Sequence, residues 1–293
     1  MKVKTRAYAK INLILDITAQ RTDGFHELFT VMQSVSANDV ITVEKKKGQG
    51  IEITCNNPDI PTDERNIVHK CATAFFKANR INRYGIHIDI KKNIPHAAGL
   101  AGGSADGAAT LVSLNKLYGT KLTLDNLCEI GERIGADIPF CIKGGTLLAQ
   151  GKGEVLSKMK SLRKCYIVLA KPDVAVNTGQ AYKSFDENGK IRTPDNFGML
   201  CAVQNRDLKQ IASKLDNVFE QFIEVPTRVD IKSTMYNNGA LGACMSGSGP
   251  TVFGIFENKN SAESCKAELD TFVKDVIICT PVSKGCKIIS ITE

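Results

Sequence analysis

A glycine-rich segment between a predicted strand and a predicted helix constrains this chain more than any other stretch. Residues 95–109 read Pro-His-Ala-Ala-Gly-Leu-Ala-Gly-Gly-Ser-Ala-Asp-Gly-Ala-Ala. Before them, residues 84–92 alternate isoleucine with polar side chains, which is typical of a strand, and residues 108–117 carry apolar side chains at helical spacing. A loop in this position presents free backbone N–H groups at a helix N-terminus, where an anion is stabilised. The segment is therefore a candidate phosphate-binding loop, called here the first glycine loop.

Three glycines and two polar side chains give this loop its expected geometry. Gly99, Gly102 and Gly103 are expected to take positive φ and to let a ligand approach the backbone closely. Ser104 and Asp106 are candidates to cap the following helix. A flexible connection between strand and helix is the alternative interpretation of the same residues.

A second glycine-rich segment occurs far along the chain and favours the phosphate interpretation. Residues 245–250 read Met-Ser-Gly-Ser-Gly-Pro and precede a strand-like stretch over 251–256; they are called here the second glycine loop. Neither loop has the spacing of a Walker A motif or of the Gly-x-Gly-x-x-Gly dinucleotide fingerprint. If phosphates bind here, the fold is neither a P-loop nor a Rossmann fold.

The length and composition are those of an ordinary soluble globular protein. With 293 residues, the chain is long enough for two domains at roughly 100 to 200 residues each. The net charge of +7 suits an enzyme of anionic substrates and a nucleic-acid binder equally. The ten cysteines show no zinc-site spacing, and no signal peptide or long apolar run is apparent. We therefore expect a cytoplasmic protein that does not enter the membrane.

Local patterns predict mixed α and β structure in both halves, with a boundary near Gly151 between residues 1–150 and 151–293. In the N-terminal strand over 7–17, alternation places Lys10 and Asn12 on the same face. A helix is expected over 66–79, and the run Lys-Lys-Lys-Gly at 45–48 is interpreted as the charged tip of a hairpin. Asp137, before Ile138 and Pro139, reads by itself as a turn or cap residue.

These motifs carry a resemblance to a known family. The first glycine loop is similar to the Pro-x-x-x-Gly-Leu-Gly-Gly-Gly-Ser-Ser-Asp-Ala-Ala signature of the galactokinase, homoserine kinase, mevalonate kinase and phosphomevalonate kinase (GHMP kinase) superfamily, and departs from it at Ala101, Ala105 and Gly107. The second glycine loop resembles the third motif of that superfamily. Residues 9–13 and 21–28 are similar to the branch that acts on 4-diphosphocytidyl-2-C-methyl-D-erythritol in non-mevalonate isoprenoid synthesis.

The resemblance implies a two-domain α+β GHMP kinase fold, with an ATP-binding N-terminal domain over 1–150 that is like a ribosomal protein domain, and a ferredoxin-like C-terminal domain over 151–293. It implies ATP and Mg²⁺ as cofactors, with Ser104 as a weak candidate contact and no clear protein ligands for the metal. The residues expected to bind ATP are Pro95, His96, Ala97, Ala98, Gly99, Leu100, Ala101, Gly102, Gly103, Ser104, Ala105, Gly247, Ser248 and Gly249.

The resemblance also implies the remaining roles. The 2-hydroxyl of the cytidylated substrate accepts the phosphoryl group, with Asp137 as general base and a closely paired Lys10 as cationic stabiliser. Asn12 is expected to orient the substrate. The cytosine-binding residues are expected to be Phe25, which stacks, His26, which hydrogen-bonds, and Tyr182 on the opposite face with Thr178 nearby.

Two alternatives remain open at this point. Another GHMP-type kinase, acting on mevalonate, homoserine or a sugar, would share both glycine loops. A nucleic-acid-binding protein would suit the basic charge, but the lysines are scattered, aromatic residues are only 6%, and there is no tryptophan. The expected partners are therefore a small-molecule substrate and neither nucleic acid nor membrane, for a monomer or weak homodimer.

Overall fold

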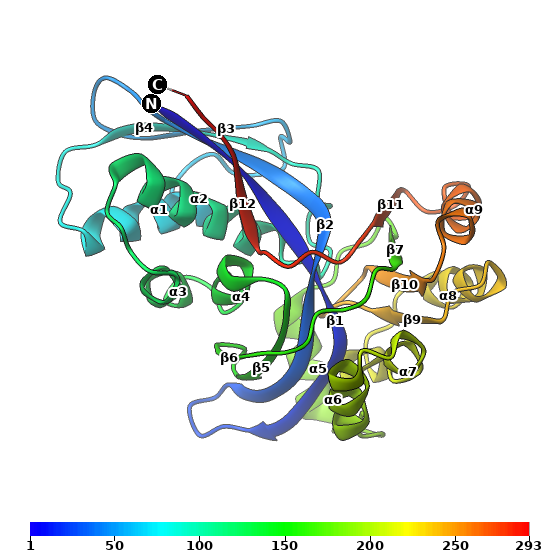
Figure 1. The fold of residues 1–293 in the computed structure, drawn as a ribbon. Helices are drawn as coiled ribbons and strands as arrows, with labels where there is room; N and C mark the ends of the chain where they lie inside the picture. The colour runs from blue at the N-terminus through cyan, green and yellow to red at the C-terminus, as the bar shows by residue number, and fades with distance from the viewer. Residues whose placement is uncertain (293) are drawn as a thin grey trace.

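Two very long antiparallel strands organise the computed structural model, which describes residues 1–292. β1 (Lys2–Gln20) and β2 (His26–Lys45) run diagonally through the whole molecule and contribute to both of its halves (Figure 1). A short turn that includes Asp23 and Gly24 joins them, and Gly24 has a φ of 82° there, a backbone conformation that glycine adopts easily in hairpin turns. The site described below lies along the middle of β1.

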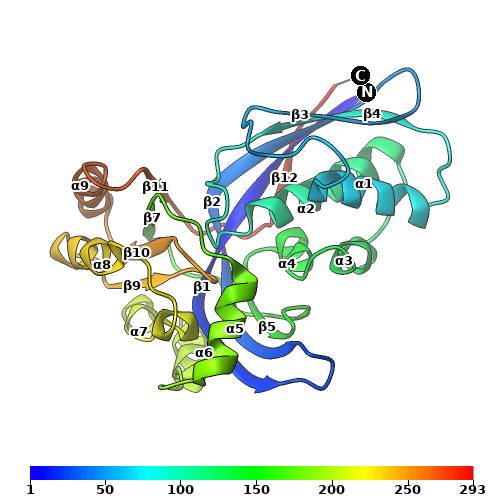
Figure 2. The same cartoon turned by 180° about the vertical axis from the view of Figure 1, so that it is seen from behind.

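The upper half is a mixed sheet covered on one face by helices. Its strand order is β12-β1-β2-β4-β3, and α1 and α2 pack against it (Figure 2). Phe75 and Phe76 of α1 are buried, and Asn66 caps this helix through the backbone N–H of Val68, which confirms the predicted helix. The elements of this sheet and the helices next to it are β3 (Gly50–Cys55), α1 (Ile67–Ala78), β4 (Gly85–Lys91), α2 (Gly102–Tyr118), α3 (Leu124–Glu132), α4 (Ile138–Lys143), β5 (Thr146–Gly151), β6 (Val155–Lys158) and β12 (Cys286–Thr292). β5 and β6 extend the sheet into the lower part of Figure 1.

The prediction of a hairpin tip at residues 45–48 is wrong. β3 does not pair with β2, because β4 lies between them, antiparallel to β2 and parallel to β3. The chain passes from β3 to β4 through α1, as parallel neighbours require a crossover. The helices bury three isoleucines of β4, Ile86, Ile88 and Ile90. Burial of these side chains favours the central position for β4, and this outweighs the local turn signal at residues 45–48.

The lower half contains a four-stranded sheet of order β11-β7-β10-β9, covered on one face by α8 and α9. Alternate residues of its strands pack in opposite directions: Phe256 faces α8 and α9, whereas Phe253 joins a core with Ile11 of β1. The elements are β7 (Tyr166–Lys171), α5 (Thr178–Asn188), α6 (Asn196–Asn205), α7 (Leu208–Ser213), β8 (Asp216–Asn217), the 3-10 helix η1 (Val218–Gln221), α8 (Arg228–Asn237), β9 (Gly242–Met245), β10 (Val252–Phe256), α9 (Lys259–Leu269) and β11 (Asp275–Cys279).

The two halves exchange strands across the predicted boundary. β6 and β12 both follow residue 150, yet both belong to the sheet of the upper half. β12 pairs with β1 from Lys2 opposite Thr292 to Ala7 opposite Cys286, and it covers an edge of β1 that would otherwise expose its backbone groups. The predicted division into 1–150 and 151–293 stays a prediction. Residues 286–292, which it assigns to the C-terminal part, pair with β1 of the N-terminal part. Both ends of the described chain lie together at the top of Figure 1.

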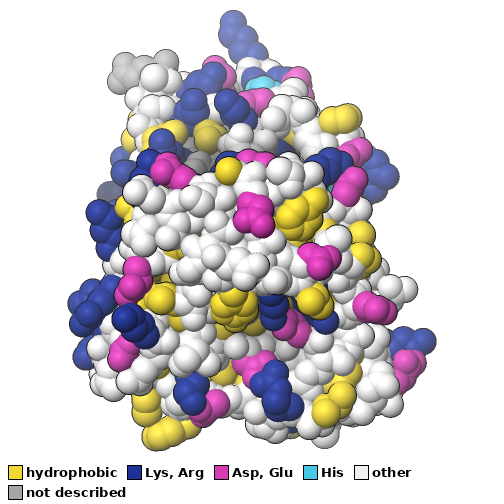
Figure 3. All heavy atoms as spheres, turned by 90° about the vertical axis from the view of Figure 1, so that its right-hand side faces the viewer, with side chains coloured by type: hydrophobic (Ala, Val, Ile, Leu, Met, Phe, Trp, Pro, Cys, Tyr) yellow, Lys and Arg dark blue, Asp and Glu magenta, His cyan; other side chains and the backbone are white. Residues whose placement is uncertain are grey.

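The charged side chains are mixed on the face that Figure 3 shows. Lysine, arginine and acidic residues occur there in small interspersed groups rather than as one basic field. Within residues 1–292, no helix combines the length and the apolar character that crossing a membrane requires.

Candidate active site

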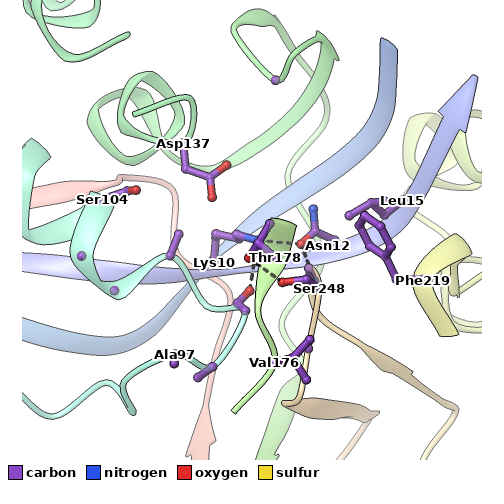
Figure 4. A pocket seen from close by; sticks show the side chains of 18 of the residues that line it. Lys10, Asn12, Leu15, Ala97, Ser104, Asp137, Val176, Thr178, Phe219 and Ser248 are labelled. Carbon is purple, nitrogen blue, oxygen red and sulfur yellow. Dashed lines mark hydrogen bonds between the residues drawn. The ribbon is translucent and has the colours of Figure 1, made fainter. Parts of the chain in front are cut away.

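A cavity of about 620 Å³ opens where both glycine loops meet β1 (Figure 4). It brings together most of the predicted site residues from five separate parts of the chain. Leu100 and Ala105 are buried instead, at 1% and 0% exposure, and do not line it. Its lining includes Lys10, Asn12, Pro95, His96, Ala97, Ala98, Gly99, Ala101, Gly102, Gly103, Ser104, Asp137, Thr178, Tyr182, Gly247, Ser248 and Gly249.

The predicted pair on β1 connects the two glycine loops. The Lys10 ammonium donates hydrogen bonds to Asn12 Oδ1 at 2.7 Å and to the carbonyl of Gly99 at 3.0 Å. The backbone N–H of Gly247 donates to the same Asn12 oxygen at 2.9 Å, and Ser246 Oγ donates to the Gly99 carbonyl at 3.0 Å. These bonds hold both loops against β1 and fix the position of the Lys10 ammonium, which is the charged group among these bonded residues.

Asn12 has protein partners at both ends of its carboxamide. Its oxygen accepts from Lys10 and Gly247, and its nitrogen donates to Thr30 Oγ1 at 2.8 Å. Asn12 is 2% exposed and therefore acts here mainly to orient Lys10 and the second glycine loop. Its predicted contact with substrate stays a prediction.

The residues with positive φ in the first glycine loop are not all the predicted ones. Gly99 has a φ of 72°, but Gly102 and Gly103 lie in the first turn of α2 and are helical. The other positive φ values are those of Ala97, at 50°, and Ala101, at 55°. Space at Gly102 is limited instead, because a Cβ there would lie 3.2 Å from Ile94 Cγ2 and 3.3 Å from Lys92 Nζ.

Ser104 and Asp106 do not cap α2, so this prediction is wrong. The helix starts one turn earlier than expected: Ala101 is the N-cap residue and offers no side-chain hydrogen bond. The N–H groups of the first helical turn have no intrahelical carbonyl to bond. Since Gly102, Gly103 and Ser104 line the cavity, this uncapped turn is available to an anion.

A matched pair of substitutions tests the backbone of this loop. Gly99→Ala should lower the free energy of unfolding by about 1–3 kcal/mol, because the added Cβ overlaps the carbonyl oxygen of Ser246 and strains a positive φ. Ala101→Gly should instead raise the free energy of unfolding by about 1 kcal/mol, because glycine removes the strain of a positive φ at this position. The family signature has glycine here. Urea unfolding of both variants measures the effect, and changes of the same sign would contradict this account.

A buried charge cluster lies beneath the start of α2. The ammonium of Lys92 forms ion pairs with Asp39 and with Asp106, the latter at 2.7 Å, and all three side chains are at most 6% exposed. Burial raises the pKa of Asp106 well above its usual value, although the nearby Lys92 opposes the shift. Burial lowers the pKa of Lys92, but the two carboxylates raise it by more. Asp106 Oδ1 has no hydrogen-bond partner among the described residues. One lysine therefore neutralises two carboxylates, and one of the carboxylate oxygens stays unbonded.

Asp137 occupies the N-cap position of α4 without acting as a cap. Its side chain makes no capping hydrogen bond, it is half-buried, and its carboxylate points into the cavity (Figure 4). Lys10 lies across the cavity, held by Asn12 and the Gly99 carbonyl on its own wall. The expected close pairing of the two side chains is not observed, and the space between them can receive an acceptor group.

An adjoining cavity of about 800 Å³ contains the predicted cytosine-binding residues Phe25 and His26, and shares Asp137 and Tyr182 with the first. Phe25 is 56% exposed, and Lys152 Nζ lies 4.8 Å from its ring centroid. His26 stacks on Tyr182 with centroids 4.8 Å apart. Tyr182 therefore packs against His26, and burial raises its pKa to about 12. Its predicted place opposite Phe25 stays a prediction.

Several lining residues lie outside the predicted set. Lys152 borders both cavities, and Lys92 lines the first. Of the predicted residues, Thr178 has its Oγ1 2.9 Å from Ser248 Oγ, which links α5 to the second glycine loop. A lysine between Gly151 and Gly153 is a local signal that could have indicated Lys152. The partners of Lys92 had no such signal, because Asp39 is distant in sequence.

Two family models match the chain over most of the regions that form the site. GHMP kinases N terminal domain matches residues 66–145, and GHMP kinases C terminal matches residues 199–275. Among similar proteins, the 4-diphosphocytidyl-2-C-methyl-D-erythritol kinase of Caldicellulosiruptor saccharolyticus is 43% identical over 94% of this chain and 95% of the relative. The protein of that name from Clostridium perfringens is 44% identical over 89% and 91%. The nucleic-acid-binding alternative is not favoured by these relatives.

Solved structures confirm the predicted GHMP kinase fold. A crystal structure of 4-(cytidine 5'-diphospho)-2C-methyl-D-erythritol kinase aligns with a TM-score of 0.76 at 27% identity, over 95% of this chain and 98% of the other. A homoserine kinase from Cytophaga hutchinsonii aligns with a TM-score of 0.79 at 22% identity, over 98% and 97%, and shows the fold alone. Sequence identity, rather than backbone similarity, therefore separates the branches. The chain belongs to the GHMP kinase superfamily and, within it, to the family of 4-diphosphocytidyl-2-C-methyl-D-erythritol kinases.

Proposed function

We propose that this protein transfers the γ-phosphoryl group of ATP to the 2-hydroxyl of 4-diphosphocytidyl-2-C-methyl-D-erythritol, giving the 2-phosphate and ADP. The names and the identity of the relatives support the substrate. The observation that carries the chemistry is the cavity in which Asp137 faces Lys10 beside the uncapped start of α2. A mevalonate, homoserine or sugar kinase is the less favoured candidate, because the solved structures of such kinases resemble this chain in fold alone.

The residues of the cavity suit an in-line transfer from ATP to a weakly acidic hydroxyl. Asp137 accepts the hydroxyl proton as the acceptor oxygen bonds to the γ-phosphorus and the bond to the β-phosphate oxygen breaks, releasing ADP. Lys10 stabilises the negative charge that develops on the acceptor oxygen and on the transferred group. Its bonds to Asn12 and Gly99 hold the ammonium in place before the substrate arrives.

Phosphate binding falls to the backbone of the two loops in this proposal. The N–H groups of Gly102 to Ser104 at the start of α2 hold the phosphates of ATP, as helix N-termini hold anions generally. Gly247 to Gly249 close over the phosphates from the opposite side. The N–H of Gly247 is bonded to Asn12 and that of Gly249 to the carbonyl of Ser246, so Ser248 supplies the N–H of this loop.

The lining residues fit a magnesium ion that arrives with ATP. No cluster of three or more His, Cys, Asp or Glu side chains able to hold a metal occurs in residues 1–292. Mg²⁺ in kinases needs only one or two protein oxygens, because phosphates and waters supply the rest. The Ser104 hydroxyl borders both cavities and is our candidate contact. When bound, the ion neutralises charge on the β- and γ-phosphate oxygens.

The adjoining cavity is assigned to the cytidine of the substrate. Phe25 is exposed enough to stack on a base, and His26 carries a ring nitrogen for a hydrogen bond. Asp137 and Tyr182 border both cavities, so that a substrate could extend from the cytidine end to the reacting hydroxyl.

An assay of ADP release tests the proposal directly. The purified protein is incubated with ATP, magnesium and, in parallel, the cytidylated substrate, mevalonate or homoserine. ADP formation with the cytidylated substrate alone is the expected result. Activity only with mevalonate or homoserine would overturn the assignment of substrate and leave the kinase chemistry intact.

The cellular setting is part of the same proposal. All ten cysteines are unpaired, which suits the reducing cytoplasm. We expect the protein to act there as a monomer or weak homodimer, which sedimentation measurements can establish.

A further inference from the structure

The ring of His26 is held on three sides by residues of α5. Its face stacks on Tyr182 at an interplanar angle of 22°, and its edge meets the ring of Phe185 with centroids 5.8 Å apart. Its Nε2 atom lies 2.7 Å from Oδ1 of Asp186. With 9% of its surface exposed, the imidazole has little freedom to turn.

The contact with Asp186 decides which ring nitrogen of a neutral His26 carries the proton. A carboxylate only accepts hydrogen bonds, so the nitrogen facing it must be the donor. The other nitrogen, Nδ1, is then an acceptor, because neutral imidazole has one of each. In the described part of the chain, Nδ1 has no hydrogen-bond partner, and His26 borders the cavity assigned to cytidine.

We propose that Asp186 is a positioning residue that makes the protein selective for cytosine over uracil by keeping Nδ1 of His26 an acceptor. The inference rests on the proposed function, because it concerns the base of that substrate. Cytosine carries an amino group at C4, which donates, whereas uracil carries an oxygen there, which accepts. An acceptor nitrogen therefore bonds to the first base and repels the second.

The position of Asp186 suits this role. It lies on α5 with its side chain 40% exposed, so the hydrogen-bond partner of His26 can be exchanged without opening the core. It also borders the same cavity as Phe25, and Tyr182 on the same helix supports the other face of the imidazole. One helix thus sets both the plane and the tautomer of the neutral ring.

The experiment compares the binding of CDP and UDP to the full-length protein by calorimetry, in the wild type and in Asp186→Asn. The wild type should bind CDP at least about tenfold more tightly, the difference of one hydrogen bond. In Asp186→Asn, the amide can donate to or accept from Nε2, so both tautomers become available. The preference should then fall to about twofold or less, mainly through tighter UDP binding, while ATP binding is unchanged.

Two further variants separate positioning from general damage. Glu187→Gln removes a neighbouring exposed carboxylate of α5 that pairs with Lys183, and it should keep the wild-type preference. Asp186→Glu restores a carboxylate and should recover part of the preference. An unchanged ratio of CDP to UDP affinity in Asp186→Asn would overturn the inference. Because this readout needs no turnover, it is independent of the assay that tests the reaction itself.

Discussion

Asp137→Asn is expected to lower kcat by about 10²- to 10⁴-fold with the cytidylated substrate, the usual contribution of a general base. The amide preserves the shape of the side chain but cannot accept the hydroxyl proton. Since Asp137 makes no capping bond in α4, the variant should fold normally. Steady-state assays of kcat, together with calorimetric titration of ATP, measure the two effects separately.

The matched control for this variant is Glu129→Gln, which removes an exposed carboxylate of α3 that lines neither cavity of the site. It should leave kcat within about twofold of the wild type, because surface substitutions rarely change the site. Turnover of Asp137→Asn close to that of the wild type would remove Asp137 from the mechanism. A similar loss of ATP affinity in the variant would indicate misfolding instead.

Lys92→Met is expected to lower the free energy of unfolding by about 3–5 kcal/mol, the usual effect of removing one partner from a buried ion pair. The methionine fills a similar volume, but Asp39 and Asp106 then remain buried without their cation. Urea unfolding at neutral pH measures the loss. A loss below about 1 kcal/mol would show that the two carboxylates do not depend on Lys92.

Asp106→Asn is the informative companion to this variant because it leaves the pair of Lys92 and Asp39 intact. The pKa of Asp106 is raised by burial above its ordinary value of 3.8. The stability that the Asp106 carboxyl contributes is therefore fully present only below pH 3.8, where the group is protonated in both the folded and the unfolded state. This stability is lost as the pH rises through the folded-state pKa. Relative to the wild type, Asp106→Asn should therefore gain stability progressively as the pH rises above the ordinary carboxyl pKa of 3.8. Parallel unfolding curves across this range would contradict the shift.

Features that depend on neighbouring residues could be predicted well. The helix after Asn66, the turn at Gly24 and the shared face of Lys10 and Asn12 all follow from short-range periodicity and turn chemistry. The start of α2 was predicted one turn too late, because serine and aspartate are frequent caps and here occur inside the helix. Glycine spacing indicated the phosphate loops without showing that Ala97 and Ala101 would take positive φ.

The sequence by itself determined the class of this protein. The features that indicate this class are the two glycine loops, the residues around Lys10 and His26, and the alternation of helices and strands. Each of them lies within a short segment, so it can be recognised without a structure. Only the tertiary structure decided which segments meet. Asn12 bonds to Gly247 and His26 to Asp186, contacts that are 235 and 160 residues apart in the chain. β12 likewise returns to β1 across the predicted boundary. Such contacts depend on the packing of whole sheets and helices, and no local pattern of residues encodes them.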